Sequence, residues 1–201
     1  MKRSKNDPKI LDISALISEA TEVYPGDPKP TITQISNSED GSNVSLLSIS
    51  THTGTHIDPP LHLFEDKPGA DRVDLKALIG WAELYDVINC KEITVDSLKN
   101  LKPTADIILL KTKNLESYLT EDAAQYIARM NPSAFGIDSL SVDPPETLKS
   151  HRILLKKGII IVEGLRFGKI PAGCYFFICL PLKIKNGDGG PARAIIIKDF
   201  S

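Results

Sequence analysis

The sequence predicts an α/β fold, a single domain with a mixed β-sheet or barrel-like core. Most of its apolar runs are short, rich in Ile, Val and Leu, and bounded by turn residues, as strands are. Helical patterns separate some of these runs but only turns separate others, which favours a mixed sheet over a regular strand–helix repeat. The 14 prolines and 13 glycines are scattered and no internal repeat is visible, so we expect residues 1–201 to form one domain.

The expected elements follow from local patterns. Strands are predicted at residues 9–13, 31–35, 44–51, 83–88, 107–111, 158–162, 175–180 and 193–198. The clearest helix is 121–130, because Thr120 can cap it, Glu121 and Asp122 suit its first turn, and Asn131-Pro132 ends it. Shorter helices are predicted at 75–79, 95–100 and 150–157.

Composition excludes several classes of protein. The chain has 24 basic and 26 acidic residues, a net charge of -2, so we expect no nucleic-acid partner. No apolar run approaches the roughly 20 residues of a membrane span, and segment 1–8 lacks the apolar core of a signal peptide. The odd, widely spaced cysteines Cys90, Cys174 and Cys179 are expected to be reduced thiols in the core or strands of a cytoplasmic protein. The single tryptophan, Trp81, is expected to pack in the core.

Candidate chemistry concentrates in residues 52–62, whose sequence is HTGTHIDPPLH. This segment holds three of the four histidines and one aspartate, all at even positions: His52, His56, Asp58 and His62. In an extended chain alternate side chains share a face, so these four would point the same way. Imidazole and carboxylate suit Zn, Mn or Fe, and a bound cation offsets the cost of burying them. The pattern therefore indicates a metal site.

The backbone of this segment must bend for such a site to form. Gly54 and Pro59-Pro60 disfavour a helix. A straight strand would hold the Cα atoms of His52 and His56 about 13 Å apart, too far for both rings to reach one ion easily. Gly54 permits a bend and the prolines stiffen the exit of the chain, so we expect a preorganised site on a stiff loop.

Two further candidate ligands lie far along the chain. His151 falls at the start of a predicted helix, and Glu163 follows the apolar run 158–162. Each alone is more commonly a surface or strand-end residue. Together with the ligands in 52–62 they would be enough for two metal ions bridged by a carboxylate, but sequence spacing cannot show that they converge.

The string HTGTHIDPPLH matches every defined position of HxGTHxDxPxH, the motif of the cyclase-like metal-dependent hydrolases, which include bacterial kynurenine formamidases and isatin hydrolases. The resemblance extends over nearly the whole chain. Further similar elements are YPGD at 24–27, GIDSLSVD at 136–143, LPLK at 180–183 and GDGGPAR at 187–193. The resemblance implies a swivelling β/β/α fold assembled as a homodimer or homotetramer.

The resemblance also implies roles for individual residues. By similarity, a divalent metal, expected as two Zn²⁺ or Mn²⁺ ions, is held by His52, His56, Asp58, His151 and Glu163. The last histidine of the motif, His62, takes the place of the catalytic acid/base. The implied activity is hydrolysis of a C–N bond in a small amide, formamide or lactam, as in arylformamidases.

The expected chemistry uses metal-activated water. An ion of this kind polarises a carbonyl and lowers the pKa of bound water toward neutrality, and His62 would pass a proton to the leaving nitrogen. A lactone or ester hydrolase, and a lyase or cyclase with the same metals, are alternatives. A non-catalytic metal-binding protein is a third, although it would have no use for a sixth, uncoordinated imidazole.

Three remaining features bear on substrate and mechanism. Formamidase-like relatives tend to carry Gly and an aromatic residue where this chain has Lys113-Asn114. An aromatic wall of the pocket would then be missing, so we expect modest activity on N-formylkynurenine and more on another small amide, lactam or lactone. The run 186–190 lacks the lysine and helix of a phosphate loop and is expected to be a turn. No GxSxG elbow supports Ser139 or Ser141 as a nucleophile.

Overall fold

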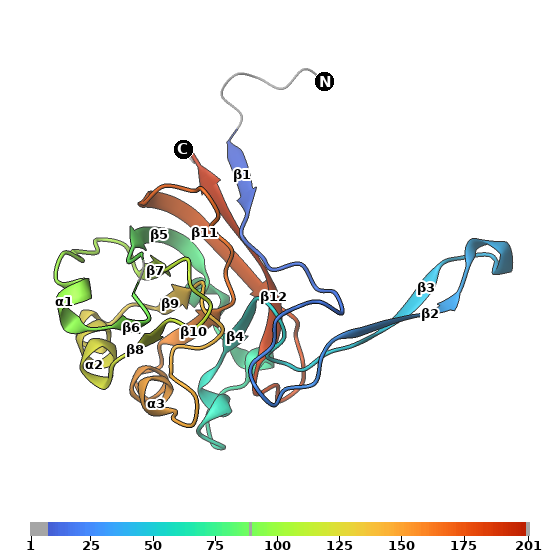
Figure 1. The fold of residues 1–201 in the computed structure, drawn as a ribbon, viewed down its shortest axis with the longest axis horizontal. Coiled ribbons are helices and arrows are strands. Elements are labelled where there is room, and N and C mark those ends of the chain that lie inside the picture. The colour runs from blue at the N-terminus through green and yellow to red at the C-terminus, as the bar shows by residue number, and fades with distance from the viewer. Residues whose placement is uncertain (1–7, 89, 200–201) are drawn as a thin grey trace.

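The computed structural model describes residues 8–88 and 90–199 (Figure 1), so most of the basic segment 1–8 lies outside the described residues. The strands are β1 (Lys9–Asp12), β2 (Thr31–Ser36), β3 (Val44–Ser48), β4 (His56–Asp58), β5 (Ile79–Asp86), β6 (Glu92–Ile93), β7 (Ile107–Lys111), β8 (Tyr118–Leu119), β9 (Ala134–Ile137), β10 (Ile160–Glu163), β11 (Gly173–Pro181) and β12 (Gly190–Lys198). The α-helices are α1 (Val95–Leu98), α2 (Glu121–Met130) and α3 (Lys149–Lys156). Among the described residues, no helix is long and apolar enough to cross a membrane.

The main sheet closes into a barrel. Its strand order is β1-β12-β11-β5-β7-β9-β10-β4, and a further pairing of β12 with β4 joins the two sides. Strands β5, β7, β9 and β10 run parallel to their neighbours in that series, whereas β4, β11 and β12 pair antiparallel. The predicted α/β class with a mixed, barrel-like core is therefore confirmed.

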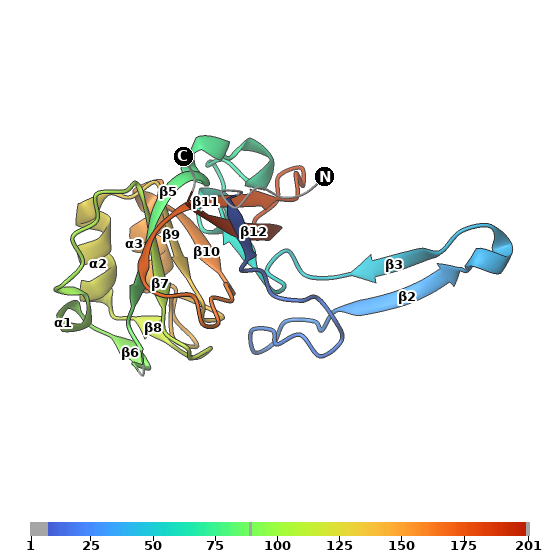
Figure 2. The ribbon, with the colours of Figure 1, turned by 90° about the horizontal axis from the view of Figure 1, so that it is seen from above.

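Two apolar clusters lie on opposite sides of the barrel wall. Alternate residues such as Ile57, Ile160 and Val162 fill the interior, while Ile161 and Phe135 face outward under the helices. In Figures 1 and 2 the helices cover one side of the barrel, and α2 packs against α3. This alternation decides where the candidate site lies, since the side chains on either side of Ile57 must face outward.

Several predicted elements have different boundaries. The helix expected at 75–79 is a 3₁₀ helix, Leu75–Ala77, and β5 already begins at Ile79. Strand β9 was missed because it is short and contains Gly136. A Cβ at Gly136 would lie 2.5 Å from Leu109 Cδ2 and 2.9 Å from Leu165 Cδ1, so the tight packing inside the barrel requires glycine there.

The core position expected for Trp81 is wrong. Trp81 is 46% exposed on the outer face of β5, where its ring meets the edge of Phe176. The described helices pack on a different part of the barrel wall, so this apolar strand face is left open. The predicted placement of the cysteines is confirmed, because Cys174 and Cys179 lie in β11, Cys90 packs against the outer apolar cluster, and all three are free thiols.

Strands β2 and β3 form a separate hairpin that extends away from the barrel (Figure 2). Its exposed large apolar side chains are Ile32, Ile35, Val44, Leu46 and Leu47. A two-stranded hairpin is at best marginally stable in water by itself, and this one exposes its apolar side chains to solvent.

Candidate metal centre

The backbone of segment 52–62 bends as expected. Gly54 has a φ of 66°, and the bend brings the rings of His52 and His56 to a centroid distance of 5.1 Å. His56–Asp58 is a strand, whereas residues 51–55 form turns and bends, and Pro60–His62 is a 3₁₀ helix. The shared face predicted for the four side chains is thus achieved by a turn and a 3₁₀ helix flanking a short strand.

The candidate ligands that are distant in sequence join this segment. Glu163 pairs with His56 across the β10–β4 ladder, and α3 brings in His151. The Nε2 atom of His151 lies 3.2 Å from Asp58 Oδ2 and 3.3 Å from Glu163 Oε1. Two buried groups of possible ligand atoms result: His52, His56 and Asp58 form one, and Asp58, His151 and Glu163 form the other. A third, more exposed group contains His52, His62 and Asp188. Asp58 is common to the two buried groups, as a bridging carboxylate would be.

His52, His56 and His151 each have one ring nitrogen in contact with an oxygen that is not among the candidate ligand atoms of the two buried groups. The contacts are His52 Nε2 to Asp188 Oδ2 (3.4 Å), His56 Nδ1 to Gly54 O (3.0 Å) and His151 Nδ1 to Asp143 Oδ2 (2.8 Å). A neutral imidazole has one N–H and one lone pair. If the N–H is donated to the outer oxygen, the lone pair of the other nitrogen faces Asp58 in all three rings, and Glu163 as well in His56 and His151.

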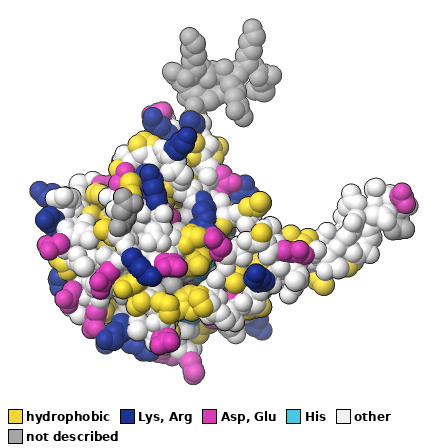
Figure 3. Space-filling view, viewed as in Figure 1, with side chains coloured by type: hydrophobic (Ala, Val, Ile, Leu, Met, Phe, Trp, Pro, Cys, Tyr) yellow, Lys and Arg dark blue, Asp and Glu magenta, His cyan; other side chains and the backbone are white. Residues whose placement is uncertain are grey.

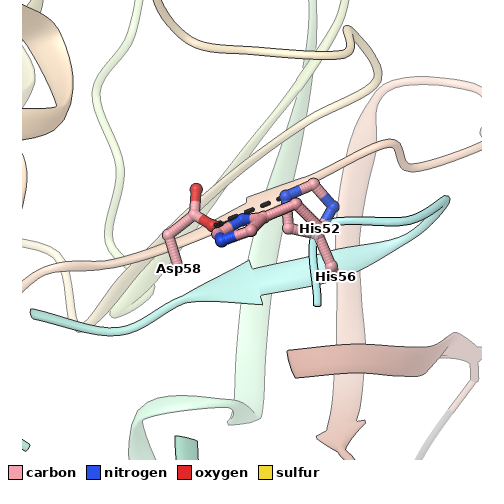
Figure 4. Close-up of side chains that lie close together, drawn as sticks. All are labelled: His52, His56 and Asp58. Carbon is pink, nitrogen blue, oxygen red and sulfur yellow. Dashed lines mark ion pairs between the residues drawn. The ribbon is translucent and has the colours of Figure 1, made fainter. Parts of the chain in front are cut away.

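The ring nitrogens that face Asp58 and Glu163, together with the carboxylate oxygens, form a set of atoms suited to binding a cation. Asp58 Oδ1 lies 2.8 Å from His52 Nδ1 and 3.4 Å from His56 Nε2, the pairs dashed in Figure 4. Yet among the described residues this fully buried oxygen has no partner with hydrogen-bond geometry. Imidazole nitrogens and carboxylate oxygens that converge in this way are the ligand types that Zn²⁺ and similar divalent ions take in proteins.

The charges in this cluster shift the pKa values strongly. Burial alone would lower the pKa of His56, but Asp58 and Glu163 outweigh it and raise the value to about 10. Burial and the neighbouring Asp58 charge both raise the pKa of Glu163, but contacts with His151 and His56 outweigh them and lower it. The cluster therefore holds its carboxylates ionised in a buried place, where they need a positive charge.

His62 differs from the other histidines. Its ring lies 4.5 Å from that of His52 and 5.5 Å from that of His151, and burial lowers its pKa. It lines a cavity of about 520 Å³. The other residues lining this cavity include Tyr24, Asp27, Leu140, Glu146 and Leu148, together with all five candidate ligands. His62 is therefore at the cavity surface, beside the ligand cluster.

Two carboxylates beside the histidines were missed by the sequence reasoning. Asp143 lies in the motif-like stretch 136–143, which was a usable signal. Asp188 lies in the Gly-rich run 186–190, which forms a turn and a bend as predicted, except that Gly190 already begins β12. Lys113-Asn114 do not line the cavity, so the missing aromatic wall inferred there has no support in this structure.

Comparisons with known proteins agree with this geometry. The model of the Cyclase family matches residues 11–144. A kynurenine formamidase from Salinibacter ruber is 36% identical over 93% of this chain and 96% of its own length. A solved structure described as a potential metal-dependent hydrolase with cyclase activity is 33% identical, has a TM-score of 0.86, and covers 97% of this chain and 100% of its own. Isatin hydrolase A from Labrenzia aggregata shares the fold, with a TM-score of 0.81 at 21% identity over 96% of this chain and 94% of its own.

One class of protein, the metal-dependent hydrolases, is defined by the barrel, the grouped His, Asp and Glu side chains, and the relatives. The chain belongs to the Cyclase family, as the family match and the identity to the Salinibacter relative show.

Proposed function

We propose that this chain hydrolyses the C–N bond of an aryl formamide with the help of two divalent ions, Zn²⁺ or Mn²⁺. The ions would be held by His52, His56, Asp58, His151 and Glu163, with Asp58 shared. The observation that carries the proposal is the pattern of the histidines: one ring nitrogen of each meets an outer oxygen, and the other faces the buried Asp58 carboxylate, joined by Glu163 for His56 and His151. The name of the Salinibacter relative, a kynurenine formamidase, supports the substrate class.

The chemistry divides between the ions and His62. Bound divalent ions polarise a carbonyl and make water a stronger nucleophile at neutral pH. His62 lies at the cavity surface with a lowered pKa, so it is largely neutral at pH 7 and can accept a proton from the attacking water. It then donates that proton to the departing amine nitrogen, which amide cleavage needs because an amide anion leaves poorly.

The cavity suits a small aromatic substrate. Its volume of about 520 Å³ is ordinary for a small-molecule site. Tyr24, Leu140 and Leu148 offer apolar wall for a ring, while the formamide end would lie near His62. N-formylkynurenine is therefore a substrate to test directly, since the reason to expect poor turnover rested on residues outside the cavity.

Other activities use the same residues. A cyclic amide such as isatin is the second candidate, favoured by the fold shared with isatin hydrolase A. Lactone or ester hydrolysis and lyase or cyclase chemistry remain alternatives that need the same ions. A non-catalytic metal-binding role leaves the placement of His62 without a purpose.

We also propose that residues 1–201 act as one domain in a cytoplasmic homodimer or homotetramer. The hairpin β2–β3, which projects from the body of the protein (Figure 3), supports assembly, because a second copy would cover the apolar side chains that the hairpin exposes. Its sequence, residues 31–48, contains no lysine or arginine, only Glu39 and Asp40 as charged residues. The three free thiols suit a reducing compartment. The molar mass in solution tests the assembly.

The function is tested by metal analysis and a substrate panel on the same preparation. We expect about two divalent ions per chain and kcat/KM of at least ~10⁴ M⁻¹s⁻¹ on an aryl formamide. The panel contains formanilide, N-formylkynurenine, isatin, a cyclic imide and a lactone. Metal content near zero after metal-replete purification would refute the ligand assignment, and turnover confined to the lactone would refute the formamide proposal while leaving the metal site intact.

A further inference from the structure

The Gly-rich turn 186–190 lies against the edge of His52. A Cβ at Gly189 would be 2.7 Å from His52 Cε1 and 2.8 Å from both His52 Nε2 and Thr51 O, so only glycine allows this approach. The turn thereby carries the carboxylate of Asp188 to the ring. Both Asp188 oxygens are used: Oδ1 accepts a hydrogen bond from Thr51 Oγ1 at 3.0 Å, and Oδ2 lies 3.4 Å from His52 Nε2.

His52 needs this contact more than its two neighbours do. Its side chain is 18% exposed, whereas those of His56 and His151 are 4% and 3% exposed. Burial keeps water away from the other two rings, whereas water can reach His52 and compete for its nitrogens. The outer oxygens of His56 and His151 belong to the backbone of Gly54 and to a buried carboxylate, while that of His52 belongs to an exposed turn.

We propose that Asp188 is a positioning residue that orients His52 for metal binding. Accepting the Nε2 proton of His52 leaves the lone pair on Nδ1, which faces Asp58 Oδ1 at 2.8 Å. A carboxylate that holds the far nitrogen of a ligating histidine fixes the ring and makes it a better ligand. The inference rests on the proposed role of His52 as a ligand, and it assigns to the C-terminal turn a part in building the site.

The effect should be selective for one ion. Asp188 contacts His52, which belongs to the group with His56 and Asp58, and it touches none of the members of the group with His151 and Glu163. Loss of such an outer partner typically costs 10–100-fold in metal affinity. Because the Asp188 side chain is 58% exposed and the contact is long, we expect about tenfold, the low end of this range.

The test measures metal affinity by chelator competition, together with the visible absorption of the Co²⁺-substituted protein. Asp188→Ala should weaken one of the two ions by about tenfold, alter the Co²⁺ spectrum, and leave the other ion unchanged. Asp188→Asn keeps an oxygen that can accept the proton, and should restore part of the affinity. The matched control is Asp66→Ala, which removes a carboxylate that is 82% exposed and should change neither ion.

Three results would overturn the inference. Unchanged affinities in Asp188→Ala would show that the contact is idle. Equal weakening of both ions, with a lowered melting temperature, would show that the turn merely supports the fold. Intact affinities with a shifted pH profile of kcat would show that Asp188 acts on His62, whose ring also lies near it. If the wild-type protein itself binds no divalent ion, the proposed function fails as well, and this outcome is distinct from the other three.

Discussion

Glu83 and Glu163 are two glutamates on strands of the same barrel, and their surroundings differ in kind. Glu83, on β5, is surrounded by donors. Its Oε1 accepts from Thr104 N (2.9 Å), Thr104 Oγ1 (2.7 Å) and Ala105 N (3.3 Å), and its Oε2 accepts from the Tyr85 hydroxyl. Glu163, on β10, accepts one backbone hydrogen bond, from Val142 N at 2.6 Å. Its remaining neighbours are the imidazole nitrogens of His56 and His151 and the Asp58 carboxylate.

This difference separates a structural carboxylate from a ligand. Donors of the chain itself satisfy Glu83, and they lower its pKa although burial acts to raise it. Glu163 is only 4% exposed, and apart from Val142 N its neighbours are two imidazoles and the Asp58 carboxylate. A buried carboxylate in such surroundings is stable only if something positive joins it, whether protons on the histidines or a metal ion.

The largest expected effect comes from Glu163→Gln. The substitution keeps the size of the side chain but removes the charge, so the group with Asp58 and His151 should lose its ion. Metal content should fall from about two ions per chain to about one. Since an ion supplies several kcal/mol of transition-state stabilisation and each 1.36 kcal/mol is tenfold, kcat/KM should fall by roughly 10³-fold or more. Unchanged metal content on elemental analysis would exclude Glu163 as a ligand.

His62→Ala should have the next largest effect, and on catalysis alone. A positioned acid or base contributes roughly 10²–10⁴-fold to kcat, whereas the metal content and the melting temperature should stay at wild-type values. Metal loss from this variant, with partial rescue by added metal, would instead make His62 a ligand. An unchanged rate with both ions retained would remove it from the mechanism.

The sequence was sufficient to predict that the side chains of His52, His56 and Asp58 come together, because all three lie in 52–62 and Gly54 signals the bend. Alternation along β4 then separates Ile57, which enters the apolar interior, from its two polar neighbours. Convergence with His151 and Glu163 could not be derived from spacing, since it depends on β10 pairing with β4 and on α3 packing beside them. For these two residues the sequence offered only the resemblance.

Features that depend on tertiary packing were predicted less well. Trp81 has the apolar character of a core residue, but no local pattern shows that the outer face of β5 is left open by the helices. Asp188 is in a turn that the sequence identified correctly, yet its contact with His52 joins segments more than a hundred residues apart. Strand β9 was not predicted because it contains Gly136. From the sequence alone, a glycine needed for close packing cannot be told from a glycine that ends a strand.

Glu83→Gln is the matched substitution at the structural carboxylate and should have the smallest effect. It makes the same chemical change as Glu163→Gln, but it should leave the metal content and kcat unchanged, because Glu83 contacts none of the candidate ligands. Stability should fall instead, since an amide replaces one of the accepting oxygens. Hydrogen bonds to a charged group contribute about 1.5–3 kcal/mol, but Glu83 is only half-buried and solvent screens it, so we expect a loss of about 1 kcal/mol or less at pH 7.

The pH dependence of the stability loss in Glu83→Gln identifies the cause of this loss. The pKa of Glu83 in the folded protein is lowered from the ordinary value of 4.5, because hydrogen bonds from Tyr85 and Thr104 outweigh burial, which would raise it. A carboxylate with a lowered folded pKa stabilises the fold above its unfolded pKa, and this contribution disappears as the pH falls through the folded value. Urea unfolding of the wild type and Glu83→Gln should therefore differ at pH 7 and converge as the pH drops below 4.5. A difference that persists or grows on acidification would show that the ionised carboxylate is not what these donors stabilise, and a loss of metal in this variant would erase the distinction between the two glutamates.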